Sequence, residues 1–385
     1  MKILQSANVL VISHGYRLAS GGPAQDLRDF LKNKVSRLDY IDHPFPHADY
    51  KQTHFFFYNH GILKTIGRSI PYVGPEIFRY IQQFIVIFLF LLFSFRKYDI
   101  CFALDNHSLI AVSFFRKISR IRKLVYYSID YIPMRFTNRI INNLYHLADR
   151  IACHISDTNW VVAKHMIQAR KNNGVNLEKT SPFREVPMGF HRSEIVLQPI
   201  NKIDRFHLVY MGTILEKQGL QLIIEALPEI VKELPKIHLT IIGTGNYENT
   251  LKTLVKKLKV KSRVTFKGFI ADKNEMYTIL TTAAIGLAPY KPDPESFSYY
   301  ADPSKIKIYL GCGLPVITTH VTKFSKIIEN TKAGIIIDYD IYDFCKAVTK
   351  LISSSKLYKF HRNNAVNLSA NYVTEEILKK AIEQA

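Results

Sequence analysis

Two lysines in the second half of the chain lie where an anion would be bound. Lys217 follows an apolar run at 207–212, in the loop MGTILEKQGL, and Lys305 lies in the first turn of a helix that Ser304 begins. A helix N-terminus carries partial positive charge, so a further cation there is stable when a bound anion neutralises it. The pattern predicts a phosphate site in which Lys217, Lys305 and the helix start stabilise developing negative charge. A plain loop with a solvated lysine is the alternative for Lys217.

Glycines directly follow predicted strands in the same half. Gly212, Gly243 and Gly268 each end an apolar run, and Gly245 comes two residues after Gly243. Glycine permits tight turns and close approach of the backbone to a ligand, so these turns are compatible with diphosphate binding. They do not form a Walker loop, because the GK[ST] spacing is absent. The segment 269–270 is expected to be extended, with a backbone that can contact the edge of a base.

Three ionisable side chains follow predicted strands in the first half. Asp130 ends the run KLVYYSID, His14 follows VLVIS, and His107 follows DICFAL. Ligands of parallel sheets bind outside the carboxyl ends of the strands, so these side chains are expected at a binding site. Asp130 is predicted to stabilise a developing positive charge. A turn-capping aspartate and two ordinary loop histidines are the alternatives.

Apolar runs alternate with helical patterns along the whole chain, which indicates parallel sheets covered on both faces. The predicted strands are 9–13, 99–104, 123–130, 150–156, 207–212, 238–243, 264–268, 285–290, 314–319 and 334–338. The predicted helices are 22–34, 138–148, 219–234, 247–259, 273–283, 304–312 and 341–353. Two such series predict an α/β protein of two doubly wound, Rossmann-like domains, with the join near 190–205.

Charge and cysteine content narrow the class of protein. The 385 residues include 52 Lys and Arg against 32 Asp and Glu, a net charge of +20, and residues 1–192 hold +13 of it. This balance favours an anionic partner, although aromatic–basic RNA motifs are absent and nucleic acid is not expected. The four cysteines lie far apart without a CxxC pair, which excludes a zinc ribbon or disulfide scaffold and favours a reducing compartment. We expect no metal and no cofactor.

Two segments suggest contact with a membrane surface. The run FIVIFLFLLFSF at 84–95 has 12 residues and is too short for a span of ~20 residues. It is predicted to end a helix that starts near Pro75, either buried or at a lipid interface. The segment 114–123, FFRKISRIRK, is predicted to be a basic helix that adsorbs to anionic lipid, or else a solvated face. The N-terminus is interpreted as a buried strand rather than a signal peptide, so the expected location is cytoplasmic, peripheral on the inner face of the membrane.

Four loops in this order, MGTILEKQG, IGTG, VTFKGF and PSKIKIYLGCGLPVI, resemble the nucleotide-sugar domain of the GT-B glycosyltransferases. The resemblance is to the glycosyl transferases group 1 (GT4) family and covers about 206–360. SGGPAQDLRDFLKN at 20–33 resembles the family's glycine loop and first helix. The resemblance implies an acceptor-binding domain at 1–195, a donor domain at 206–360 facing it across a cleft, and a helical segment, 361–385, that packs back on the first domain.

The resemblance also implies roles for individual residues, with two departures. Lys217 matches a phosphate-binding lysine, whereas Thr213 stands where many members have arginine. Ile308 stands where a glutamate commonly holds the ribose, so ribose recognition must differ here. The predicted donor-binding residues are Gly21, Gly22, Gly212, Thr213, Gly243, Gly245, Gly268, Phe269, Ile270, Asp302, Ser304 and Ile306. The predicted catalytic residues are Asp130, Lys217 and Lys305, and the predicted acceptor-binding residues are His14 and His107.

The function that the resemblance implies is sugar transfer, with retention, from a UDP- or GDP-linked sugar to a glycan or lipid-linked acceptor. Such a reaction would serve the synthesis of cell-surface polysaccharide or glycoconjugates. Two alternatives stay open because a fold does not fix a function. One is a nucleotide-sugar epimerase on the same fold. The other is a non-catalytic protein that binds nucleotides or nucleic acid.

Overall fold

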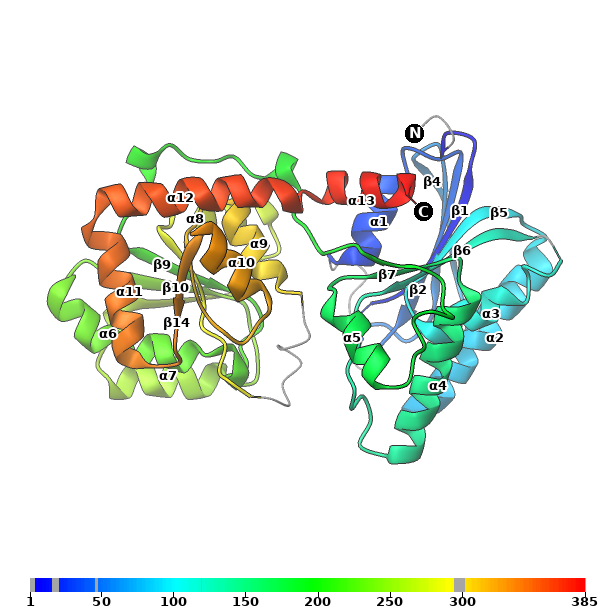
Figure 1. Cartoon of the computed structure of the whole chain (residues 1–385), viewed down its shortest axis with the longest axis horizontal. Helices are drawn as coiled ribbons and strands as arrows, with labels where there is room; N and C mark the ends of the chain where they lie inside the picture. Colours follow the sequence, from blue (N-terminus) through cyan, green and yellow to red (C-terminus); the bar gives the residue numbers. More distant parts are fainter. Residues whose placement is uncertain (1–3, 16–20, 46–47, 119, 294–301, 385) are drawn as a thin grey trace. The chain divides into compact units, whose positions relative to one another are not determined.

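A computed structural model describes residues 4–15, 21–45, 48–118, 120–293 and 302–384 (Figure 1). The chain divides into two compact units, and each is described by itself. Unit 1 is Met1–Pro187 with Leu378–Ala385, and unit 2 is Met188–Ile377. The division lies before the expected join because Phe190 pairs with Val373 of unit 2. The predicted segment 361–385 is split, since only its residues from Leu378 onward group with unit 1.

Unit 1 contains an eight-stranded sheet of order β4-β3-β2-β1-β5-β6-β7-β8. Its strands are β1 (Asn8–Gly15), β2 (Arg37–Pro44), β3 (His54–Asn59), β4 (Ile62–Arg68), β5 (Tyr98–Ala103), β6 (Ile121–Ser128), β7 (Thr158–Val161) and β8 (Phe183–Glu185). The β3–β4 hairpin is antiparallel and extends one edge of the sheet, whereas the other strands are parallel. The sequence patterns did not predict this hairpin.

The helices of unit 1 are α1 (Pro23–Leu31), α2 (Glu76–Ser94), α3 (Asn106–Ser113), α4 (Arg139–Ile155) and α5 (His165–Asn172). Helices α2, α3 and α4 share one core, to which they contribute Ile87, Val112 and Cys153. The predicted helix through the apolar run 84–95 is confirmed as the second half of α2.

Two predicted elements of unit 1 are wrong. Residues 150–156 are not a strand but the end of α4, because the helical period continues through them, with Ala152 and Cys153 buried and Ile151 exposed. Residues 114–123 do not form a basic helix, since α3 ends at Ser113 and β6 begins at Ile121. The basic side chains of this segment therefore lie on a turn and on the start of a strand.

Unit 2 contains a six-stranded parallel sheet of order β11-β10-β9-β12-β13-β14. Its strands are β9 (His207–Met211), β10 (His238–Ile242), β11 (Val264–Gly268), β12 (Ile285–Ala288), β13 (Val316–Thr319) and β14 (Gly334–Ile337). Its helices are α6 (Leu220–Glu233), α7 (Glu248–Lys257), α8 (Lys273–Thr282), α9 (Ser304–Gly311), α10 (Phe324–Thr331), α11 (Ile341–Ser353) and α12 (Ser355–Ser369), and α13 (Thr374–Glu383) ends in unit 1. Every strand and helix predicted for this half is confirmed.

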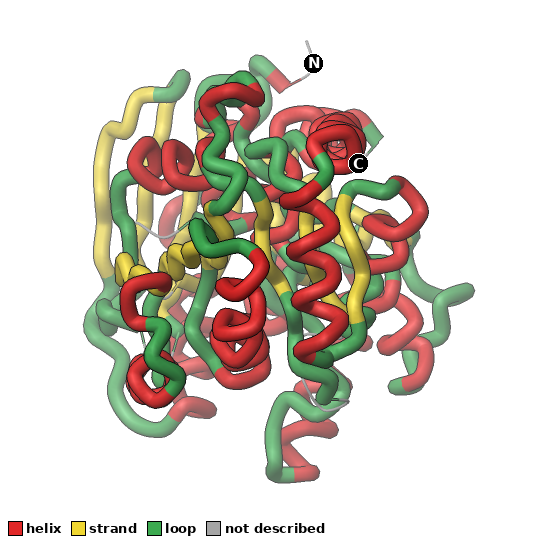
Figure 2. The backbone as a smooth tube through the Cα atoms, turned by 90° about the vertical axis from the view of Figure 1, so that its left-hand side faces the viewer, coloured by secondary structure: helices red, strands yellow, loops and turns green. Residues whose placement is uncertain are grey.

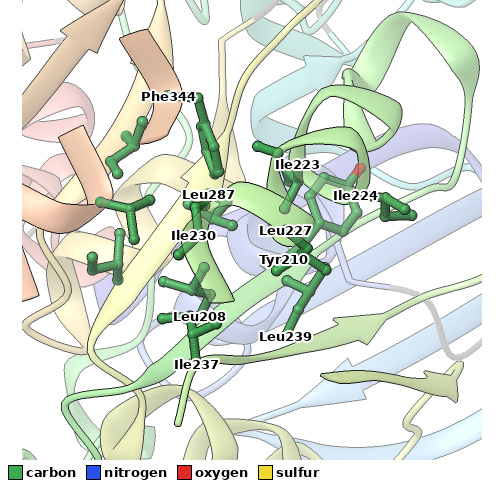
Figure 3. Close-up of a cluster of buried hydrophobic side chains, with 14 of the residues drawn as sticks. Leu208, Tyr210, Ile223, Ile224, Leu227, Ile230, Ile237, Leu239, Leu287 and Phe344 are labelled. Carbon is green, nitrogen blue, oxygen red and sulfur yellow. The ribbon is translucent and has the colours of Figure 1, made fainter. Parts of the chain in front are cut away.

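Both faces of this sheet are covered, as its continuous apolar strands predict. Leu208 and Tyr210 face a core shared with α6 and α11, which includes Ile223 and Phe344 (Figure 3). Val209, between them, faces a second core on the opposite side of the sheet. The tube view shows strands of this unit between helices (Figure 2). Because helices cover both faces of the sheet, the carboxyl ends of its strands stay open, and the loops follow them.

Candidate functional site

The glycine turns of unit 2 stack against one another at the carboxyl ends of β9, β10 and β11. The N–H of Gly212 donates to Ile242 O at 2.9 Å, and the N–H of Gly243 donates to Gly268 O at 2.7 Å. A Cβ on Gly243 would lie 2.0 Å from Gly212 O, and one on Gly245 would lie 2.1 Å from Ile214 O. The turns can approach this closely only without side chains. These glycines thus form the edge of the sheet against which a ligand would bind.

Lys305 lies beside this edge in a cavity of about 290 Å³, called here the Lys305 pocket. Its ammonium donates to Gln218 Oε1 at 2.6 Å and to Tyr210 Oη at 3.0 Å, and lies 4.2 Å from the centroid of the Tyr210 ring. Burial lowers the pKa of Lys305 to about 7. No carboxylate of the described residues pairs with it, so a bound anion would restore its charge.

The start of α9 and the Gly212 turn line the same pocket. Thr213 and Ser304 contribute to its wall, together with Gly212, Tyr290 and Asp302. The residue before the helix is Pro303, and no side chain caps the first turn. The pocket therefore combines a lysine with the N-terminus of a helix, as the sequence predicted.

Two residues predicted at the donor site are engaged elsewhere. Asp302 lines the pocket, but its carboxylate pairs with Lys307 and accepts the N–H of Met188 at 2.7 Å. Ile306 is fully buried in the second core, so its side chain does not reach the pocket. Ile308 also packs against that core, partly buried.

Lys217 does not line the Lys305 pocket. It lies in a neighbouring cavity of about 670 Å³ with Glu216, Lys291 and Asp293, and Leu215 lines both cavities. Burial lowers the pKa of Lys217, although Asp293 opposes this effect. The two predicted phosphate lysines are therefore adjacent but occupy surroundings of different charge.

The remaining predicted donor residues lie outside the Lys305 pocket. Phe269 is 63% exposed after β11, whereas Ile270 is half-buried against the second core. Gly21 and Gly22 precede α1 in unit 1, where the N–H of Asp26 donates to Gly22 O at 2.9 Å. Their contact with a donor stays a prediction.

In unit 1 the three predicted residues line a single cavity of about 220 Å³, called here the Asp130 pocket. His14, His107 and Asp130 come from the carboxyl ends of β1, β5 and β6, which are neighbours in the sheet. The structure therefore brings together side chains that the sequence related only through their positions after strands. Tyr80 of α2 and apolar side chains of α4, including Leu144, complete the wall.

Asp130 forms an ion pair with Arg135 on the turn after β6. The Asp130 side chain stays 57% exposed, while that of Arg135 is 22% exposed. Burial opposes the charge of Arg135, but the Asp130 carboxylate outweighs burial and raises the pKa of Arg135. Asp130 thus presents a solvent-facing carboxylate to the pocket with a cation already beside it.

Asp105, which no sequence pattern indicated, links the two histidines. His14 Nδ1 lies 3.0 Å from one carboxylate oxygen of Asp105, and His107 Nδ1 lies 2.9 Å from the other. Asp105 also caps α3 by accepting the N–H of Ser108 at 2.7 Å. Burial opposes protonation of His14, but Asp105 outweighs it and raises the pKa of His14. The signal for Asp105 in the sequence was its position, directly after a strand and before a helix.

The fold of the whole chain is shared with solved glycosyltransferase structures. Anabaena HepE, solved in complex with UDP, superposes with a TM-score of 0.69 and 14% identity, covering 98% of this chain and 99% of that chain. The GT-B fold predicted from the sequence is thereby confirmed.

The second half of the chain matches a family model. Residues 205–354 match the family described as Glycosyl transferases group 1, which confirms the predicted resemblance over this segment. Spore coat protein SA of Bacillus subtilis is 26% identical over 210 residues, 50% of this chain and 49% of that protein. An uncharacterized glycosyltransferase of Haemophilus influenzae is 22% identical over 189 residues, 48% of this chain and 51% of that protein. These matches span about half the length of the curated relatives, and the narrower GT4 assignment stays a prediction.

Proposed function

We propose that this chain is a glycosyltransferase that takes its sugar from a nucleotide diphosphate sugar. The observation that carries the proposal is the Lys305 pocket, where a lysine without a carboxylate partner meets a helix N-terminus and a stacked glycine edge. A diphosphate supplies the missing negative charge. In the transfer, Lys305 and the helix start stabilise the charge that develops on the leaving nucleotide. HepE was solved with UDP, which makes UDP-sugars the first donors to test.

The Asp130 pocket is the proposed site of the sugar and acceptor. Asp130 is exposed enough to contact a ligand, and its carboxylate favours the positive charge that develops at the anomeric carbon. We propose that the transfer proceeds with retention and serves the synthesis of polysaccharide or glycoconjugate. The Asp130 and histidine side chains are polar, whereas Ile141 and Leu144 of α4 form an apolar part of the wall. Such a pocket suits an acceptor with a polar head and an apolar tail.

The outward face of α4 supports a lipid-linked acceptor. This helix buries Asn142, His146 and Asp149, while its apolar residues Ile140, Leu144, Leu147 and Ile151 are exposed. Buried Asp149 pairs with Arg170, which offsets the loss of hydration. A helix that turns its apolar stripe outward presents a surface for an apolar partner.

Helix α2 presents a second apolar stripe. Its exposed residues recur every three or four positions: Phe78, Ile81, Ile85, Leu89 and Leu92. Helix α3 packs against both α2 and α4, and Phe114 after α3 contacts Phe84 and Phe88 of α2. No helix in the described part of the chain is long and apolar enough to cross a bilayer.

Exposed basic side chains lie near these helices. Lys97 follows α2, Lys117 lies in the turn after α3, Arg122 lies at the start of β6, and Arg139 begins α4. Apolar stripes flanked by lysine and arginine favour adsorption to anionic lipid. We therefore propose that unit 1 binds peripherally to a membrane that carries the acceptor.

A donor screen tests the proposed function. Purified protein is incubated with UDP- and GDP-sugars without acceptor, and nucleotide release is followed while the released sugar is identified by NMR. We expect slow release from one class of donor, with the anomeric configuration retained. An epimerised sugar would favour the epimerase, and binding without release would favour a non-catalytic protein.

A further inference from the structure

A cluster of metal-ligating side chains lies in the Asp130 pocket, apart from Asp130 itself. His14, Asp105 and His107 each offer one ligand atom, and these atoms lie within 4.8 Å of one another. Side-chain exposures are 6% for His14 and 18% for both Asp105 and His107. The cluster is thus mostly shielded from water but open to the cavity that it lines.

The amide of Gln83 fixes the protonation of both rings. Gln83, on α2, is buried, and its Nε2 donates to Pro44 O at 3.1 Å. The carbonyl of Pro44 can only accept a hydrogen bond, so the Nε2 atom of Gln83 must point to it. The other amide atom of Gln83, Oε1, therefore faces the histidines. It lies 2.8 Å from His14 Nε2 and 3.2 Å from His107 Nε2. Both Nε2 atoms must therefore carry a hydrogen and donate it to Gln83.

When hydrogen is on Nε2 of a neutral ring, the Nδ1 atom carries a lone pair and no hydrogen. Each Nδ1 atom then faces a carboxylate oxygen of Asp105, at 3.0 Å for His14 and 2.9 Å for His107. These two nitrogens and the carboxylate oxygen all lie within 4.8 Å of one another, close enough to share one cation.

A single divalent ion satisfies both Nδ1 atoms and the carboxylate together. Two imidazole nitrogens and one carboxylate form a donor set that suits zinc and similar transition metals. Metal-bound histidines usually donate their other N–H to an oxygen, as both do here to Gln83. The carboxylate is held in place by the N–H of Ser108 at 2.7 Å and its hydroxyl at 2.9 Å.

We propose that His14, Asp105 and His107 bind a divalent transition-metal ion of the zinc class, with Gln83 as its outer support. The remaining coordination positions face the Asp130 pocket, where water or a ligand hydroxyl completes the shell. The site lies wholly in unit 1 and does not depend on the proposed donor chemistry in unit 2.

The test is metal binding by the full chain after removal of adventitious metal with a chelator. Titration with Co²⁺ is followed by visible absorption, and Zn²⁺ affinity is measured by calorimetry. We expect one ion per chain, with a Co²⁺ spectrum typical of nitrogen and oxygen ligands. His14→Ala, His107→Ala and Asp105→Asn should each weaken binding by at least about 100-fold. Gln83→Leu should weaken it by ~10-fold or more, the scale for losing an outer partner.

Matched variants keep this test decisive. Asn caps helices as well as Asp, so Asp105→Asn retains the cap of α3 and removes the charge. His238→Ala, in unit 2, should bind the ion as the native protein does. The proposal is overturned if the native chain takes up no ion, or if Asp105→Asn binds as tightly as the native chain. Ring ¹⁵N NMR showing both histidines doubly protonated at neutral pH, in protein saturated with Zn²⁺, would overturn it as well.

Discussion

The cations of the two pockets are held in opposite ways. In unit 2, Lys305 bonds the neutral acceptors Gln218 and Tyr210, and burial lowers its pKa to about 7. In unit 1, Arg135 pairs with Asp130, whose charge raises the pKa of Arg135 against the effect of burial. A buried cation without a counter-charge is prepared for an incoming anion, whereas an internally balanced pair suits a neutral, hydroxyl-bearing ligand. The contrast supports donor phosphate in unit 2 and sugar or acceptor in unit 1.

Removing the uncompensated cation should have the largest effect. Lys305→Ala should lower nucleotide release from the donor by about 10²-fold, the scale for losing one charge stabiliser. Lys217→Ala, in the neighbouring cavity with Glu216 and Asp293, should have a smaller effect. Lys291→Ala serves as a control for charge alone, because Lys291 pairs with Glu216. If Lys305→Ala releases nucleotide as fast as the native chain, the proposed contrast between the two pockets is wrong.

Changing the paired carboxylate of unit 1 should affect turnover rather than donor affinity. Asp130→Asn should lower kcat by roughly 10-fold or more, since the charge acts only on the developing oxocarbenium-like state. Nucleotide affinity, which unit 2 provides, should stay within about 2-fold. Turnover, calorimetry and melting temperature are measured on one preparation. If Asp130 only holds Arg135, the melting temperature falls while kcat of the folded protein is retained.

The pH dependence of donor binding should report Lys305. Its free amine has a pKa of about 7, so it is increasingly neutral at higher pH. A bound diphosphate favours the charged form and raises that pKa, so affinity should fall as pH rises above 7, by up to about 10-fold per pH unit. Calorimetry from pH 6 to 9 with a UDP-sugar measures this. Lys305→Arg stays charged and should bind with little pH dependence, and a flat native profile would contradict the assignment.

Membrane binding should show the smallest change for a single substitution. Ile85→Ser or Ile151→Ser should each reduce sedimentation with anionic vesicles by several-fold, roughly the loss expected for withdrawing one aliphatic side chain from lipid. Phe360→Ser, on an exposed residue of unit 2, is the control. Binding should weaken as salt screens the basic side chains. Equal sedimentation of all variants would exclude the α2 and α4 stripes from the membrane surface.

The fold of unit 2 was predictable because its signals are local. Each strand is a continuous apolar run that ends in a glycine turn or other short loop, so the boundaries in the sequence match those in the structure within a few residues. In unit 1 the run RIACHIS has the composition of a strand, yet it completes α4, whose polar residues face inward. The period was misread because the preceding part of α4 buries polar Asn142, His146 and Asp149 instead of its apolar residues.

The sites were predictable in position but not in detail. Placing Asp130, His14 and His107 after strands was enough to bring them into one pocket, because parallel strands end at the same edge. Asp105 and Gln83 were missed, since their importance arises from contacts with residues distant in the sequence. The expectation of no metal was based on local motifs alone and stays a prediction, which the titrations with Co²⁺ and Zn²⁺ test. Lys217 and Lys305 were grouped by residue type, whereas the structure separates them into two cavities.

The central claim is that a nucleotide diphosphate sugar binds in the Lys305 pocket. Calorimetry with a panel of UDP- and GDP-sugars, on the native chain, Lys305→Ala and Lys291→Ala at pH 6.5, tests it most directly. We predict that one class of donor binds the native chain and Lys291→Ala alike with one site per chain. Lys305→Ala should bind that donor at least about 10-fold more weakly, because the variant lacks the buried ammonium that lines the pocket at the start of α9. Absence of binding by every donor, or equal affinity of Lys305→Ala and the native chain, would contradict the account.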